Sequence, residues 1–484
     1  MSNNLSTLYK IALVFSAKIG KGVGGLFLTW ALAKKYGAYG SGLFFIPYTF
    51  AFLCALISQL GLGNACMKFA PVLKSEDPEN LSFLWTITLL VVGCFSAILL
   101  ITVFFVPEFF STLVFKNPDN TRYILYASPI IFFWSLTYLI IFFRQSLGDV
   151  SGITIVENTV IPWGMLIIAC STFVVDMSVV YYVLSISLLF GLTFIYAFMS
   201  TRHKYSLSFS FKLNSSLTLK DIIAYCLPLL AIAFAQNSLV WINTLILGGV
   251  GSIADSAVFV SAMRVAMSIS ILLYTFNSVY VPHISAAYAR NDFDSINKLY
   301  SDITCSLSLF SFVILALSLL YSNFIMDAFG VDYDGGTGCL LYLILGNVFS
   351  CYIGPVGYVL LMAGRSKIEA FNTLTALGVN AVLCVFLYKF MGVSGAGAAF
   401  FAAFVVVNML RYFQCKRILG LRWLNSLQAK IMIIQLFFVV AYLLVRPFDF
   451  NREAIAASFL ILYSLVNIKN IKILINKMKV SYSI

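Results

Sequence analysis

Apolar segments of about 20 residues follow one another along nearly the whole 484-residue chain, with only short polar stretches between them. A helix that crosses the hydrocarbon core of a bilayer needs about 20 mostly apolar residues. By that measure the chain contains about fourteen spans, and twelve is the competing number. The segments lie near residues 10–33, 41–64, 81–106, 121–144, 152–174, 177–200, 221–248, 254–282, 297–325, 337–362, 367–388, 394–415, 428–446 and 452–470. The sequence therefore predicts an all-α polytopic membrane protein.

The composition excludes several other classes of protein. Hydrophobic residues make up 61% of the chain and charged residues 10%, whereas soluble domains are about 45–50% apolar and about 25% charged. The net charge of +12 is spread between the apolar segments, so we expect no nucleic-acid partner. The ten cysteines occur without a CxxC pair, and His203 and His283 are the two histidines. The sequence therefore predicts no metal site and no cofactor.

The basic residues predict the orientation of the spans. With the N-terminus in the cytoplasm, 21 Lys and Arg residues fall in cytoplasmic stretches and 7 in external ones, as the positive-inside rule requires. An even number of spans then places both termini in the cytoplasm. The loops are too short to hold a folded catalytic domain, and no nucleophile–base set is evident, so we expect no enzyme.

The two halves of the chain resemble each other at an offset near 214 residues. Gly37–Pro71 and Gly251–Asp292 each run from an external turn through a span to a cytoplasmic proline-containing stretch, and Gly148 corresponds to Gly364. This parallel repeat predicts two six-helix lobes that enclose a midplane site, an arrangement typical of transporters. The predicted units are an N-terminal lobe, a C-terminal lobe, and two further helices with a basic tail, over residues 1–205, 206–420 and 421–484.

Three cations lie inside predicted spans, where a charge is costly. Lys18 and Lys21 share a face of the first span, and Arg264 lies near the middle of the eighth, with no acid at a spacing that would pair with them. A cavity lined by such cations suits an anion, and phosphate above all. The alternatives are lysines that reach toward headgroups and an arginine bonded to carbonyls. Four glycines in Ala17–Gly25 allow the helix to bend, or a neighbour to approach closely.

Polar and aromatic residues in the seventh and eighth spans are candidates for contacts with a sugar. These candidates are Gln236, Asn237, Trp241, Asn243 and Asn277. The alternative is that they hydrogen-bond between helices.

Glu157 is the only carboxylate that falls clearly inside a predicted span. Its two interpretations are a proton-coupling group and an end-of-span residue that faces headgroups.

Four motifs carry a resemblance to a known family. They are GAYGSGLFF (37–45), GLGNACMKFAP (61–71), ADSAVFVSAMR (254–264) and MGVSGAGAAFFAAF (391–404). With them the chain resembles the Wzx O-antigen flippases, within the multidrug/oligosaccharidyl-lipid/polysaccharide (MOP) exporter superfamily. The resemblance implies alternating-access transfer of an undecaprenyl-pyrophosphate-linked oligosaccharide to the periplasmic leaflet of a bacterial inner membrane. It implies a cationic cavity between two lobes, and as partners this substrate, membrane lipids and other polysaccharide-assembly proteins.

Two alternatives to a flippase stay open. A drug or metabolite exporter of the same superfamily would share the fold, but such exporters typically place carboxylates in the cavity, where this chain has lysines. A membrane-embedded glycan polymerase or ligase would need a substantial external loop, and the external loops here are short.

Overall fold

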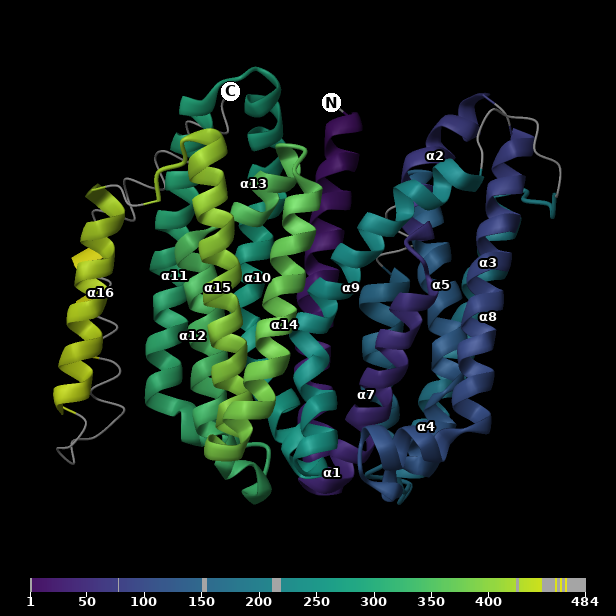
Figure 1. Cartoon of the computed structure of the whole chain (residues 1–484), viewed down its shortest axis with the longest axis horizontal. Helices are drawn as coiled ribbons and strands as arrows, with labels where there is room; N and C mark the ends of the chain where they lie inside the picture. The colour runs from purple at the N-terminus through teal and green to yellow at the C-terminus, as the bar shows by residue number, and fades with distance from the viewer. Residues whose placement is uncertain are drawn as a thin grey trace.

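The computed structural model describes residues 2–76, 78–149, 155–210, 219–423 and 426–445, with 458, 462–463 and 466–467. Within these residues the chain is helical almost throughout and contains no strand. The predicted all-α class is therefore confirmed (Figure 1).

The N-terminal half begins with α1 (Ser2–Ser58), which comprises the first two predicted spans. They meet at Gly37, where φ is 66° and ψ is −173°, a backbone region that residues with a β-carbon rarely adopt. The further elements of this half are α2 (Leu62–Glu76), α3 (Pro78–Phe105), η1 (Phe109–Val114), η2 (Pro118–Asn120), α4 (Thr121–Ala127), α5 (Pro129–Ser146), η3 (Val156–Val160), α7 (Ile161–Ser171) and α8 (Val179–Tyr205).

The C-terminal half repeats the same plan and ends with an additional helix. Its elements are α9 (Leu219–Val250), α10 (Ile253–Ala289), α11 (Phe293–Asp327), η4 (Val331–Gly336), α12 (Thr337–Ile353), α13 (Val356–Met362), α14 (Ser366–Met391), α15 (Val393–Leu419) and α16 (Ser426–Val445). Figure 1 shows two groups of helices side by side, with the beginning of α1 between them and α16 outermost. α16 packs on α11, where Gln435 donates a hydrogen bond to the Ser308 carbonyl at 2.9 Å.

The described residues contain ten helical segments long and apolar enough to cross a membrane, which makes this a multi-pass membrane protein. Three features account for the difference from the fourteen predicted spans. α1 counts once although it contains two spans, and two apolar helices, Val156–Ser171 and Ser426–Val440, are shorter. The last predicted span, 452–470, falls almost entirely outside the described residues.

The internal repeat is visible in the backbone. Gly37 joins the two parts of α1 as Gly251 joins α9 to α10. Gly148 and Gly364 follow the equivalent helices of the two halves, and both have a positive φ, 83° and 71° respectively. The shared conformation at Gly148 and Gly364 supports the predicted repeat at this pair, whereas Gly37 has a positive φ and Gly251 does not.

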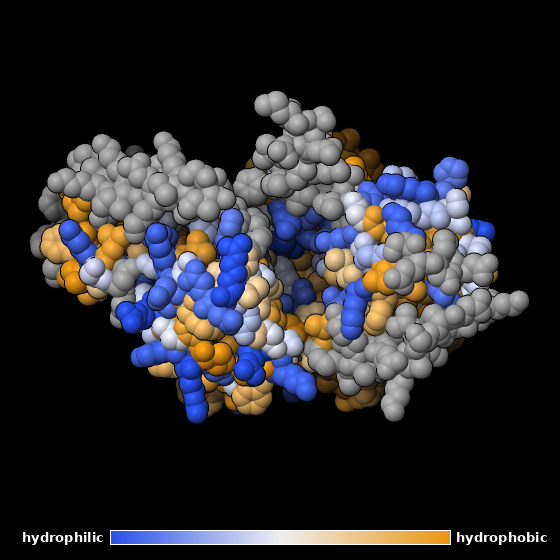
Figure 2. Space-filling view, turned by 90° about the horizontal axis from the view of Figure 1, so that it is seen from above, coloured by the Kyte–Doolittle hydropathy of each residue, from blue (hydrophilic) through white to orange (hydrophobic). Residues whose placement is uncertain are grey.

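Seen from above, the end of the molecule at which α1 begins is hollowed between the two halves (Figure 2). Hydrophilic residues lie inside this hollow. At the opposite end the halves touch. Trp30 Nε1 donates to the Ala328 carbonyl at 3.0 Å, and Asp332 accepts a hydrogen bond from the Ala38 amide at 3.3 Å.

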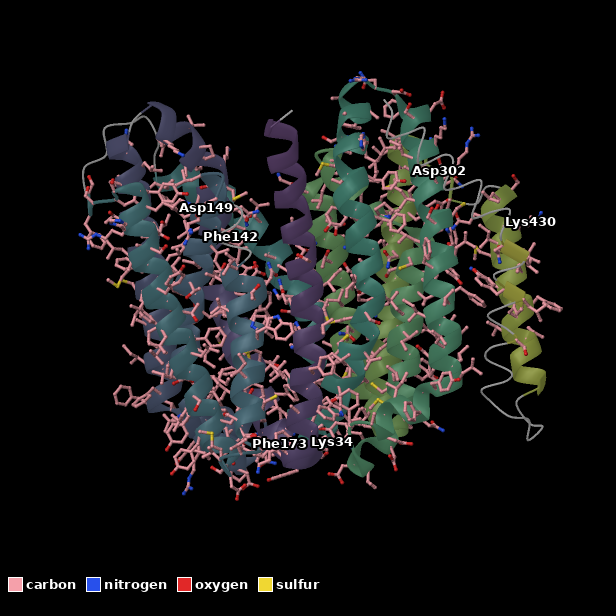
Figure 3. The ribbon with its side chains drawn as sticks, turned by 180° about the vertical axis from the view of Figure 1, so that it is seen from behind. Lys34, Phe142, Asp149, Phe173, Asp302 and Lys430 are labelled. Atoms are coloured by element: carbon pink, nitrogen blue, oxygen red, sulfur yellow. The ribbon has the colours of Figure 1, made fainter. Side chains whose placement is uncertain are left out.

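Both halves contain buried ion pairs. In the N-terminal half Asp149 pairs with Arg144 of α5 and with Lys204 of α8, the latter at 2.9 Å. Figure 3 shows Asp149 and Asp302 toward one end of the molecule and Lys34 at the other.

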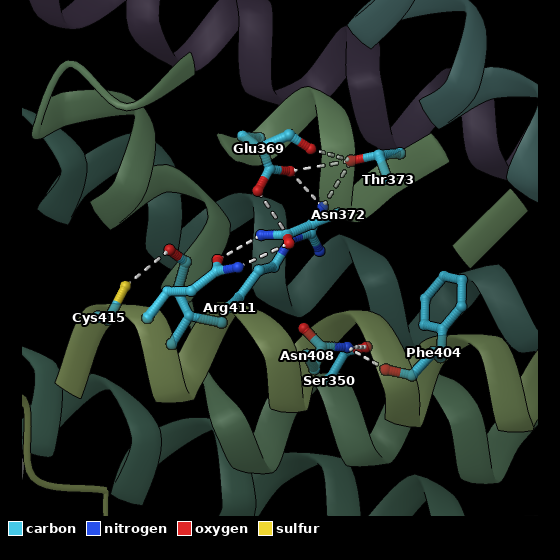
Figure 4. Close-up of polar contacts among 10 residues, drawn as sticks. Ser350, Glu369, Asn372, Thr373, Phe404, Asn408, Arg411 and Cys415 are labelled. Atoms are coloured by element: carbon cyan, nitrogen blue, oxygen red, sulfur yellow. Dashed lines mark hydrogen bonds and ion pairs between the residues drawn. The ribbon is translucent and has the colours of Figure 1, made fainter. Parts of the chain in front are cut away.

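In the C-terminal half Glu369 of α14 pairs with Arg411 of α15 (Figure 4). The Glu369 side chain is 1% exposed, and Asp302 of α11 is buried as well. The expectation that Glu157 is the only carboxylate clearly inside a span is therefore wrong. Glu369 and Asp302 lie near the beginnings of their helices, where a sequence cannot distinguish burial in a lobe from exposure to headgroups.

Candidate functional site

The first part of α1 packs against both halves, and its four glycines lie at these contacts. A β-carbon on Gly24 would lie 3.6 Å from the Trp163 indole of α7. On the other side, a β-carbon on Gly25 would lie 3.1 Å from Nη1 of Arg264 on α10. The segment stays helical, and the structure shows the close approach that was expected for these glycines.

Arg264 reaches from α10 toward α1 and lies over an aromatic ring. Its guanidinium carbon is 4.9 Å from the centre of the Trp241 ring of α9, a distance at which a cation and a ring face attract. Its Nε is buried and has no hydrogen-bond partner among the described residues. The predicted site residues Trp241 and Arg264 are therefore in contact, and Gly25 provides the space beside them.

Lys21 forms an ion pair that the sequence did not predict. Its Nζ lies 2.8 Å from Oε1 of Glu157, and the side chains of Lys21 and Glu157 are 44% and 22% exposed. The expectation that no acid pairs with the three cations is wrong for Lys21. The partners are 136 residues apart, and helical spacing reports only on neighbours within a few turns.

Lys18 is exposed, and none of the described carboxylates forms an ion pair with it. Positions 18, 21 and 25 follow the i, i+3, i+7 pattern of a single helix face. Because an α-helix rises 1.5 Å per residue, Lys21 lies about 4.5 Å beyond Lys18, and Gly25 about 6 Å further. Lys18, Lys21 and the Arg264 guanidinium at Gly25 therefore form a row along α1, which we call the cation row.

The other predicted residues of α9 and α10 differ in their surroundings. Gln236 is exposed, and Asn237 donates to the carbonyl of Ala233, one turn earlier in its own helix, at 2.8 Å. Asn277 is 4% exposed, and neither amide atom has a hydrogen-bond partner among the described residues. Among these three, Gln236 has the side chain most open to a soluble group.

Asn243 lies apart from the cation row, inside the C-terminal half. It is fully buried and donates to Oδ1 of Asn380 at 3.2 Å and to the Ala396 carbonyl at 3.1 Å. These bonds join α9 to α14 and α15, so Asn243 takes part in contacts between helices, which is the alternative interpretation of this residue.

Trp163 is a residue of the site that the sequence analysis did not identify. It follows Pro162 in α7, and its indole lies beside Gly20 and Gly24. The i, i+4 spacing of the two glycines was a signal of a close neighbour on that face, but it does not identify the neighbour. As for metals, the described residues hold no group of three or more His, Cys, Asp or Glu side chains that could bind one.

Comparisons with known proteins agree with this architecture. Residues 228–386 match the model of the MatE family. No curated protein matches the chain. A structure of the lipid II flippase MurJ in an inward closed conformation superimposes with a TM-score of 0.70, at 16% identity, covering 94% of this chain and 99% of that one.

Two structures of multidrug resistance MATE family transporters of the MOP superfamily are also similar. The inward-facing one has a TM-score of 0.61 at 16% identity, covering 84% of this chain and 94% of that one. The outward-facing one has a TM-score of 0.55 at 13% identity, covering 84% and 96%. The chain therefore has the fold of MurJ and of the MATE transporters of the MOP superfamily, and its residues 228–386 match the MatE family.

Proposed function

We propose that this protein is a flippase that moves an undecaprenyl-pyrophosphate-linked oligosaccharide, such as an O-antigen repeat unit, from the cytoplasmic to the periplasmic leaflet. The pyrophosphate binds at the cation row, the glycan occupies the hollow between the lobes, and the polyprenyl tail stays in the bilayer. The two lobes then rock around the site, which opens on the other side of the membrane.

The observation that carries this proposal is the cation row itself. Lys18 and Arg264 have no ion-pair partner among the described carboxylates, and Lys21 has one whose side chain is still 22% exposed, Glu157. Arginine offers a planar fork and lysine a compact charge, and both suit phosphate oxygens. A cationic drug would be repelled by this surface. The fold shared with a protein described as a lipid II flippase adds support.

The residues around the cation row have distinct parts in the proposed cycle. Lys18, the most exposed of the three cations, meets the pyrophosphate first, and Arg264 receives it deepest. Trp241 offers a ring face to a sugar beside the guanidinium. Gln236, Asn237 and Asn277 supply amides on α9 and α10 for sugar hydroxyls.

Genetic complementation tests whether the proposed lipid-linked oligosaccharide is the substrate. In a bacterium that lacks its own O-antigen flippase, the wild-type chain is expected to restore long surface polysaccharide. Lys18→Ala and Arg264→Ala should each lower it by about tenfold or more, since a hydrogen bond to a charged group contributes about 1.5–3 kcal/mol. Lys34→Ala, which removes an exposed lysine of the same helix at the other end, is the matched control. Full activity in both site variants at normal membrane levels would contradict the proposal.

A second candidate, an exporter of drugs or metabolites, is favoured by the match of residues 228–386 to the MatE family. Vesicles containing the purified protein and a fluorescent polyprenyl-pyrophosphate sugar separate the two candidates. A flippase makes the outer-leaflet fraction of this lipid change with time. An exporter leaves it unchanged and transports a water-soluble compound instead.

A further inference from the structure

The positive charge at each of the three positions of the cation row has different surroundings. Lys18 is exposed to water, Arg264 lies over the Trp241 ring, and Lys21 is held by a carboxylate of the chain itself. The Lys21–Glu157 bond therefore occupies the middle of the surface at which the proposed function places an anion. A substrate phosphate that reaches Lys21 has to replace the Glu157 carboxylate.

The local structure around Glu157 allows another anion to replace its carboxylate on Lys21. Glu157 lies in η3, a π-helical turn, and such turns are rare and frequent at functional sites. Its neighbours Val156 and Asn158 are buried and anchor the turn, whereas 22% of the Glu157 side chain and 44% of the Lys21 side chain remain exposed. Because both side chains are partly exposed, an anion can reach this pair and compete for Lys21.

The cation row keeps its positive charge when no substrate is bound. After release, an alternating-access transporter returns empty, and its cavity loses contact with water on the way. Unpaired cations make that passage costly, because a charge in a low-dielectric surrounding loses its hydration. A carboxylate on Lys21 lowers this cost by removing one net charge and supplying a hydrogen-bond acceptor.

We propose that Glu157 is a built-in counter-ion that takes the place of the substrate's phosphate on Lys21 during the return of the empty transporter. This inference rests on the proposed function, because it assumes an anion at the cation row. Pyrophosphate displaces Glu157 on loading, and Glu157 returns to Lys21 on release. Glu157 thus weakens anion binding and speeds the empty return, and it has no contact with the substrate in the loaded state.

The variant Glu157→Gln tests the effect of Glu157 on anion binding separately from its effect on the empty return. With inorganic pyrophosphate as the probe, the purified variant is expected to bind about two- to fivefold more tightly than wild type, because its competitor is gone. In vesicles, net flipping of a fluorescent polyprenyl-pyrophosphate sugar should fall by about threefold or more. Exchange of labelled for unlabelled lipid, in which the carrier is loaded in both directions, should stay within about twofold of wild type.

Two control variants keep the test specific. Asp176→Asn removes the acidic partner of Lys35, another lysine of α1 that forms an ion pair, and should change neither pyrophosphate affinity nor net flipping. Lys21→Gln combined with Glu157→Gln should lose the gain in affinity, because that gain requires a free Lys21. Thermal unfolding in detergent verifies that each variant is folded.

Two results would overturn the inference. One is unchanged or weaker pyrophosphate binding by a folded Glu157→Gln variant. The other is an equal fall of net flipping and exchange, which indicates a structural role for the pair. These results differ from a failure of the proposed function, in which the wild-type protein itself neither binds pyrophosphate nor flips the lipid.

Discussion

At the scale of single residues, the site depends on how Arg264 is held. The guanidinium has a ring of α9 on one side and the backbone of α1 on the other, where Gly25 supplies the space. A charge alone does not reproduce this arrangement. A lysine ammonium has no planar face to lie on the indole and cannot bind two phosphate oxygens as a fork.

Arg264→Lys is therefore expected to lower transport by about tenfold, although it keeps the charge. The loss combines a cation–π contact of about 0.5–2 kcal/mol with the second hydrogen bond of a bidentate pair. The measurement is the rate of lipid flipping in vesicles containing equal amounts of protein. A variant as fast as wild type would mean that only the charge of Arg264 matters.

Gly25→Ala is expected to impair transport while the protein stays folded. The new methyl group would lie 3.1 Å from Nη1 of Arg264, so the guanidinium has to move away from α1. Gly378→Ala is the matched control, because Gly378 lies in α14 with no atom within 4 Å of its β-carbon position. It should leave transport unchanged and raise stability by about 0.5–1 kcal/mol. Equal transport by the two variants would contradict the assignment.

At the scale of helices, buried charges join neighbouring elements into units. Glu369 of α14 accepts hydrogen bonds from Arg411 of α15, one of them at 2.9 Å, and Thr373 donates to the same carboxylate at 3.2 Å (Figure 4). A buried pair of this kind adds little net stability compared with apolar residues, but the loss of one partner leaves a charge uncompensated.

Glu369→Gln should therefore destabilise the protein by about 3–5 kcal/mol. The double variant Glu369→Gln with Arg411→Met should lose much less, because no buried charge remains. Thermal unfolding of the wild type, both single variants and the double variant gives the coupling free energy. A coupling near zero would show that the ion pair does not hold α14 to α15.

A helix cap makes a pH-dependent contribution. Asp292 precedes α11, and its carboxylate accepts bonds from the Ser295 hydroxyl at 2.6 Å and the Ser295 amide at 3.0 Å. These bonds lower the pKa of Asp292 below its usual value of 3.8. Because the folded-state pKa is the lower one, the stabilisation is present above pH 3.8 and is lost as the pH falls through the folded-state pKa.

Asp292→Ala is thus expected to unfold at a lower temperature than wild type between pH 5 and pH 8. The difference between the two melting temperatures should be constant in that range and should shrink as the pH falls below 3.8 and through the lowered pKa of Asp292. A difference in melting temperature that grows on acidification would contradict a stabilising contribution from the ionised Asp292 carboxylate.

At the scale of the whole molecule, hydrogen bonds join the halves at one end, and a hollow separates them at the other (Figure 2). Asp332 of η4 accepts a hydrogen bond from the amide of Ala38 at the turn of α1. This contact has to open if the site is to become accessible from that side of the membrane.

The double variant Ala38→Cys with Asp332→Cys should form a disulfide that stops net transport, and a reducing agent should restore transport. The unsubstituted chain, which has exposed thiols at Cys94 and Cys170, is the control for the oxidant. Undiminished transport by the cross-linked protein would exclude opening at this contact.

The sequence predicted the architecture well because spans, turns and repeats are local patterns. Fourteen apolar segments, the turn at Gly37 and the pair Gly148 and Gly364 can all be found by position along the chain. The partners of the charged residues could not be predicted, because Lys21 and Glu157 meet across 136 residues. Nor does a pattern of hydropathy separate Asn243, which joins helices inside a lobe, from Trp241, two residues away and beside Arg264.

The glycines of α1 have a consequence for how related sequences can diverge. Two of them lie beside side chains from different halves of the protein: Gly24 beside Trp163 and Gly22 beside Ile271. A β-carbon would be in ordinary contact 3.6 Å from Trp163 at position 24 and slightly close, 3.3 Å from Ile271, at position 22. A side chain larger than alanine at either position therefore requires the opposite side chain to become smaller or to move. Positions 24 and 163, and positions 22 and 271, should therefore covary among descendants of this chain, and the two pairs should do so independently of each other.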